Sequence, residues 1–131
     1  MNEGWHGDEY LVIFSQAESQ AAAANYHLDR RLPGYVLIGL RSWDDFIVVN
    51  PAGAALSLPT LPLEASRADG FLLPEAISLQ PDTRFTGRVK WYVKPLVFGG
   101  EPSAENTSWV THDQHVQLVT WWNDKYDSLK T

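Results

Sequence analysis

The stretch that decides the fold is Tyr35–Leu58, YVLIGLRSWDDFIVVNPAGAALSL. It contains three short apolar runs rich in β-branched or aliphatic residues, and polar turn residues separate them. The runs are Tyr35–Leu40, Phe46–Val49 and Ala54–Leu58. Short apolar runs bounded by turn residues are typical of β-strands, and links this short join antiparallel neighbours. The stretch therefore predicts an antiparallel meander, with RSWDD as the connection of its first hairpin.

The residues before the meander predict one more strand and a helix. Tyr10–Phe14 (YLVIF) is a β-rich apolar run. Ser15 and Glu18 have the spacing of a capping box, in which each side chain bonds the backbone N–H of the other residue. The alanine-rich segment that follows favours a helix from about Gln16 to Arg30, which ends before Pro33.

The residues after the meander predict a loop, a strand and a second helix. Four prolines in Pro59–Pro81 oppose regular structure, so this segment should pack on the core as a loop with at most a short helix. Arg88–Phe98 alternates apolar and polar residues, as a strand does, and Pro95 favours an edge position or a break of that strand. A second capping box at Thr111 starts a helix from about His112 to Leu129. The expected core contributions are Leu61, Leu63, Phe71, Leu72 and Leu73 from the loop, Val89, Trp91 and Val93 from the strand, and Val116, Val119, Trp122, Tyr126 and Leu129 from the helix.

These elements predict a single α+β domain over residues 1–131. One mostly antiparallel sheet should carry an N-terminal helix and a C-terminal helix packed on it. The length is that of one domain, and six tryptophans supply a large core for a chain of 131 residues.

Charge and composition exclude several function classes. The formal net charge of −6 argues against nucleic-acid binding, which needs Lys and Arg on phosphates, and is compatible with a basic protein partner. No apolar stretch approaches the roughly 20 residues of a membrane span. The acidic start lacks the basic and apolar regions of a signal peptide, and the absence of cysteine excludes disulfides. A cytoplasmic protein is expected.

No catalytic motif is present in the sequence. His112 and His115 are three residues apart on the final helix, so both rings could reach one metal ion, but no motif places a third ligand. Two solvent-facing histidines are therefore the favoured interpretation, and no metal or other cofactor is expected. The serines lack a G-x-S-x-G context, and phosphate-binding glycine motifs are absent.

The candidate partner-binding residues are Trp43, Asp44 and Asp45 in the hairpin connection, with Glu101 and Glu105 as a second acidic loop. Trp43 stands at a polar turn, where an exposed indole could anchor a partner. Adjacent strand residues point to opposite faces, so the two aspartates share a site only if the turn twists them together.

The segment Tyr26…Leu32-Pro33-Gly34-Tyr35…Ile38-Gly39 resembles the start of the SUKH superfamily domain, which includes the Smi/Knr regulators and many bacterial toxin-immunity proteins. The resemblance covers roughly Tyr26 to Phe71. It departs at Leu40–Asp45, where many members have a Gly- or Asn-rich turn. It implies an α+β fold and a non-catalytic role in binding and blocking a cognate toxin, and no binding residues carry over.

The leading hypothesis is thus an acidic immunity protein that covers the basic active site of a secreted bacterial toxin. Two alternatives remain open. One is a ligand-binding or scaffold domain of bacterial or phage origin with an aromatic groove. The other is a small metal-dependent hydrolase, which a metal bound at His112 and His115 would favour.

Overall fold

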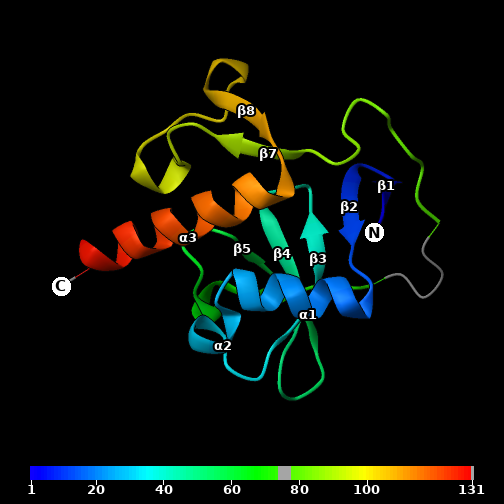
Figure 1. The fold of residues 1–131 in the computed structure, drawn as a ribbon, viewed down its shortest axis with the longest axis horizontal. Coiled ribbons are helices and arrows are strands. Elements are labelled where there is room, and N and C mark those ends of the chain that lie inside the picture. The colour runs from blue at the N-terminus through cyan, green and yellow to red at the C-terminus, as the bar shows by residue number, and fades with distance from the viewer. Residues whose placement is uncertain (74–77, 131) are drawn as a thin grey trace.

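The computed structural model describes residues 1–73 and 78–130, and its main feature is a six-stranded antiparallel sheet (Figure 1). The strand order is β1-β2-β3-β4-β5-β6, so neighbours in sequence are neighbours in the sheet. The strands are β1 (Asn2–His6), β2 (Glu9–Ile13), β3 (Val36–Arg41), β4 (Asp45–Val49), β5 (Ala55–Pro59) and β6 (Asp69–Gly70). The predicted meander and the predicted α+β class are confirmed.

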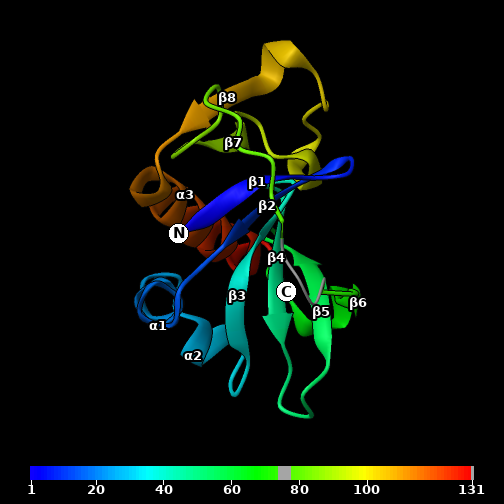
Figure 2. The ribbon, with the colours of Figure 1, turned by 90° about the vertical axis from the view of Figure 1, so that its right-hand side faces the viewer.

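Three helices lie on one side of the main sheet (Figure 2). They are α1 (Gln16–Asn25), α2 (Leu28–Arg31) and α3 (His112–Ser128). Both predicted capping boxes are present, one at Ser15 and one at Thr111. The prediction of one unbroken helix to Arg30 is wrong, because His27 has a φ of 59° and interrupts it. The break allows both Tyr26 and Leu28 to enter the core, where they are 2% and 1% exposed.

A second sheet lies beyond one end of the main sheet (Figures 1 and 2). It pairs β7 (Val89–Tyr92) with β8 (Thr107–Val110), antiparallel. The predicted strand Arg88–Phe98 is therefore too long: it ends at Tyr92, and after Pro95 the chain forms a 3-10 helix, η2 (Leu96–Phe98). Val89 and Trp91 are buried as predicted, whereas Val93 is exposed because the strand has already ended.

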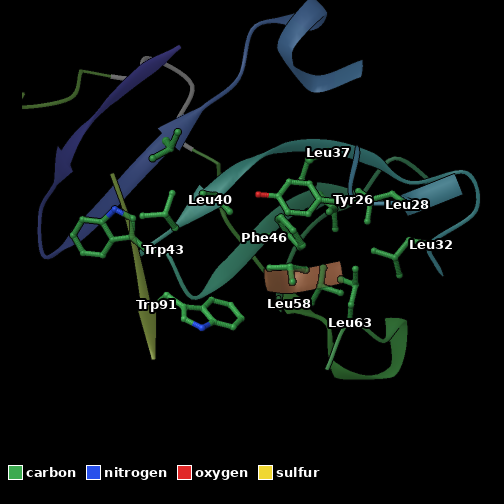
Figure 3. Packing of buried hydrophobic residues seen from close by; sticks show 14 of the residues in the cluster. Tyr26, Leu28, Leu32, Leu37, Leu40, Trp43, Phe46, Leu58, Leu63 and Trp91 are labelled. Carbon is green, nitrogen blue, oxygen red and sulfur yellow. The ribbon is translucent and has the colours of Figure 1, made fainter. Parts of the chain in front are cut away.

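The core fills the space between the main sheet, the helices and β7 (Figure 3). Phe46 of β4 meets Tyr26 edge to face at a centroid distance of 4.9 Å. The Tyr26 hydroxyl lies 2.6 Å from Nδ1 of His115, which is completely buried. The prediction that His115 is solvated is therefore wrong. His115 is buried against Tyr26, which lies 89 residues away in the chain, and the local sequence around His115 gives no sign of that contact.

Helix α3 is fixed to the segment that follows β5. The buried Asn123 side chain accepts a hydrogen bond from the Leu63 backbone N–H and donates one to the Thr60 carbonyl. Val119 is buried as predicted and Trp122 is half-buried, but Leu129 follows the last helical turn and is 60% exposed, against the prediction.

The loop after β5 packs on the core in part. It contains a short 3-10 helix, η1 (Ala65–Arg67), within the predicted limit of at most a short helix, whereas strand β6 was not predicted there. Leu63 is buried, whereas Leu72 is 92% exposed and is not a core residue. Pro74, one of the prolines of the predicted loop, lies outside the described residues. Among the described residues, no helix has both the length and the apolar character needed to cross a membrane.

Candidate functional site

The turn between β3 and β4 has an unusual backbone. Ser42 and Trp43 have φ values of 47° and 63°, a left-handed backbone conformation that residues other than glycine rarely adopt. Each such residue costs on the order of 1 kcal/mol or more, and strained residues of this kind gather at functional sites. The strain thus marks this end of the hairpin as a candidate site.

Trp43 is buried by this turn and is 7% exposed. Its ring stacks on Tyr10 at 4.5 Å and meets Trp109 edge to face at 5.0 Å. Trp43 and Trp91 lie together at one end of the core (Figure 3). The expectation of an exposed Trp43 anchor is therefore wrong. The polar neighbours in sequence left its burial open, and aromatic residues from β2 and β8 cover the ring.

A pocket of about 270 Å³ lies between this turn and the β7–η2 segment. Its lining comes from the main sheet and from the second sheet, and most of it is apolar. The lining residues are Trp43, Asp44, Asp45, Pro59, Thr60, Leu61, Lys90, Trp91, Tyr92, Pro95, Leu96 and Val97. Leu96 and Val97 are 44% and 41% exposed, whereas Trp91 is 8% exposed. The pocket therefore has a buried aromatic interior and an exposed aliphatic rim.

The two aspartates both line this pocket, so the turn does bring them to one site. Asp44 belongs to the turn and accepts a hydrogen bond from Nζ of Lys90 at 2.7 Å, and Asp45 is the first residue of β4. Lys90 Nζ also lies 3.2 Å from the Tyr92 hydroxyl. Asp45 accepts a longer hydrogen bond from Ser57 Oγ, at 3.4 Å, and has no ion pair among the described residues.

Burial changes the acidity of both carboxyl groups. It raises the pKa of Asp44, and the contact with Lys90 offsets part of that increase. It also raises the pKa of Asp45, and the neighbouring charge of Asp44 adds to the increase. The ionised Asp45 carboxylate is thus only partly solvated, and a cation placed beside it would stabilise its charge.

The second predicted acidic loop lies elsewhere. Glu101 and Glu105 are exposed and do not line the pocket. Their loop connects the strands of the second sheet, and the Asn106 side chain fixes it by donating to the backbone carbonyls of Glu101 and Lys94. Of the five predicted binding residues, the structure brings together Trp43, Asp44 and Asp45.

Several residues of the pocket were not predicted from the sequence, chiefly Lys90, Leu96 and Val97. Lys90 was assigned to the polar face of a strand, and the other two to its continuation. The signal that could have indicated them is Pro95, because proline ends a paired strand and leaves the next apolar residues free to form a wall.

The histidine pair of α3 does not form a recognisable metal site. Burial lowers the pKa of His115 to about 3, and it also lowers the pKa of His112. Nε2 of each ring is buried without a hydrogen-bond partner among the described residues. Within residues 1–73 and 78–130, no group of three or more His, Cys, Asp or Glu side chains is placed to hold a metal ion.

Comparison with known proteins finds no matching family model, no matching curated protein and no matching solved structure. The likeness of Tyr26–Phe71 to the SUKH domain thus stays a prediction from sequence motifs.

Proposed function

We propose that this chain is a non-catalytic binding protein that recognises another protein through the pocket at Trp43–Asp45. The observation that carries the proposal is the combination of an apolar pocket, an exposed aliphatic rim at Leu96 and Val97, and an acidic turn beside them. Protein interfaces are commonly built in this way, with an anchor pocket at the centre and polar groups around it.

The leading candidate for the partner is a cognate secreted bacterial toxin, and the resemblance to SUKH immunity proteins supports this choice. The chain would act in the cytoplasm by occlusion, covering a basic active site with acidic and apolar groups. The formal net charge of −6 favours encounter with a basic partner, because complementary charge raises association rates.

A second candidate is a small-molecule binding domain. The mostly apolar lining with a few polar groups is the composition that ligand sites commonly have. The volume of about 270 Å³ is slightly below the range of about 300–1,000 Å³ typical of such sites. Size therefore favours the anchoring of one partner side chain over the enclosure of a drug-sized molecule.

Co-expression tests the proposed function. Each protein encoded next to this chain is produced alone in cells; the proposal expects one of them to stop growth, and co-production of this chain to restore it. The two proteins should then co-purify as a complex. If growth is not restored and no complex forms, the immunity proposal fails.

A further inference from the structure

We propose that the pocket accepts one bulky apolar side chain, preferably aromatic, from an extended segment of the partner, and that an Arg or Lys directly following it pairs with Asp45. This inference depends on the proposed function and specifies the recognition motif of that same site.

The size of the pocket limits its occupant. A water molecule takes about 30 Å³ of liquid, so the volume of about 270 Å³ equals roughly nine waters. That space is adequate for a large side chain and too small for the nucleotide-like and cofactor-sized groups that fill larger clefts. Since Trp91 and Trp43 form the buried interior, release of water from apolar surface would drive insertion.

The charges around the pocket favour a cation next to the inserted side chain. The carboxylate of Asp44 is matched by Lys90 at 2.7 Å, so these two groups neutralise each other. The charge of Arg41 also acts on Asp45, but Arg41 is itself paired with Glu9. Asp69 adds a further negative charge near Asp45. Among the described residues Asp45 is thus a pocket carboxyl group with a hydrogen bond from Ser57 but no salt bridge, and a guanidinium would supply paired donors for it.

The aromatic lining favours an aromatic occupant over an aliphatic one. Trp43, Trp91 and Tyr92 all contribute to the lining. Edge-to-face and offset contacts between rings add about 0.5–1.5 kcal/mol beyond area burial. This preference agrees with the packing inside the protein, where Trp43 already contacts Trp5, Tyr10, Phe85 and Trp109 in such geometries.

Blocked dipeptides provide the test, with ¹⁵N-labelled full-length protein observed by NMR. Acetyl-Trp-Arg-amide should shift the backbone amides of Asp44, Asp45, Trp91 and Leu96. Acetyl-Trp-Glu-amide and acetyl-Ala-Arg-amide should bind at least about tenfold more weakly, a difference of about 1.4 kcal/mol. Absence of shifts at the pocket with the first peptide would overturn the inference, and so would equal binding of the Glu peptide.

Two single-charge variants complete the test. Asp45→Asn should weaken the binding of acetyl-Trp-Arg-amide about tenfold and abolish its preference over acetyl-Trp-Glu-amide. Glu105→Gln removes an equal charge from the loop outside the pocket, and it should change neither the affinity for acetyl-Trp-Arg-amide nor the preference over the Glu peptide. Leu96→Ala, an exposed rim position that should leave the fold intact, should also weaken binding. If Asp45→Asn and Glu105→Gln behave alike, Asp45 is not the recognition group.

The two proposals can fail separately. Restored growth in the co-expression test, together with no peptide binding at the pocket, would overturn the motif and leave the immunity proposal standing. Peptide binding at the pocket without restored growth would support the motif and overturn the toxin as its source.

Discussion

Trp43 occupies a left-handed turn position, and its indole is nevertheless almost completely buried. The Tyr10 ring stacks on it, and its Nε1 has no hydrogen-bond partner among the described residues. A buried donor without a partner costs about 1–3 kcal/mol. Trp43 thus combines a strained backbone and an unpaired donor, and the same residue shapes the wall of the pocket.

Gly39 is a second residue whose identity follows from geometry. A Cβ atom here would lie 1.9 Å from the Val12 carbonyl oxygen on the neighbouring strand β2. Gly39→Ala should therefore reduce the free energy of unfolding by more than about 2 kcal/mol in urea titrations, because backbone must move. Gly70→Ala is the matched control: a Cβ there meets nothing within 4 Å, and the change should stay within about 0.5 kcal/mol. Similar losses in both variants would contradict this explanation.

The buried His115 predicts a pH dependence of stability. Its folded pKa of about 3 is below its unfolded value near 6.5, so the unfolded chain binds more protons and stability falls as pH decreases through that window. Between about pH 7.5 and about pH 5 this one group should remove about 2 kcal/mol. His112, whose pKa burial also lowers, acts in the same direction.

The variant His115→Gln isolates this contribution. Urea unfolding at the two pH values should show a loss about 2 kcal/mol smaller than in the wild type, even if the variant is less stable overall. An unchanged pH dependence in the variant would show that His115 is not the titrating group.

At the scale of elements, α3 combines a local start signal with long-range contacts. Thr111 Oγ1 accepts a hydrogen bond from the Gln114 N–H, and the Thr111 N–H donates one to Gln114 Oε1. Farther along the helix, Asn123 bonds the loop after β5. The capping box is formed by residues three positions apart and can be recognised in the sequence. The Asn123 hydrogen bonds depend on the tertiary structure.

The cap gives a prediction of its own. Thr111→Ala should cost about 1 kcal/mol in the free energy of unfolding, because the Gln114 N–H loses its acceptor. Gln117→Ala, at an exposed position inside α3, serves as the control and should change stability by less than about 0.5 kcal/mol. A neutral Thr111→Ala would mean that the helix end is stabilised by other contacts.

The elements that were predictable from the sequence are those with local signals. Strands β2 to β5 follow from apolar runs between turns, and both long helices from their capping boxes. Strand β1 (NEGWH) has no such pattern, and it forms through its pairing with β2. Strand β8 likewise depends on its pairing with β7, across a loop of irregular residues.

The candidate site was predictable only in part, because only some of its residues carry a local sequence signal. The polar sequence of the hairpin turn indicated Asp44 and Asp45, which do line the pocket. The burial of Trp43 depends on Tyr10 and Trp109, which are distant in sequence. The rim at Leu96 depends on where the second sheet lies, and no pattern near residue 96 specifies that.

At the scale of the whole molecule, the pocket joins the two sheets. Asp44 belongs to the main sheet's hairpin and Lys90 to β7 of the second sheet, and their ion pair connects the two walls. Thr60 and Leu61, which follow β5, contribute lining beside them. A partner bound here would contact segments far apart in the sequence, so its affinity should depend on the complete fold.

The most direct test of the proposed binding site is the affinity of the purified protein for the toxin partner proposed above, once co-expression has identified it, compared between two charge insertions. Leu96→Glu places a carboxylate on the pocket rim, and Leu129→Glu places the same group at the end of α3, where leucine is also exposed, 60% against 44% at Leu96. Leu96→Glu should weaken binding by about 100-fold, close to 3 kcal/mol, as expected when an interface anchor site is disrupted. Leu129→Glu should leave the affinity within about threefold of the wild type, well under 1 kcal/mol. Equal affinities of the two variants for that partner would contradict the assignment of this pocket as the binding site.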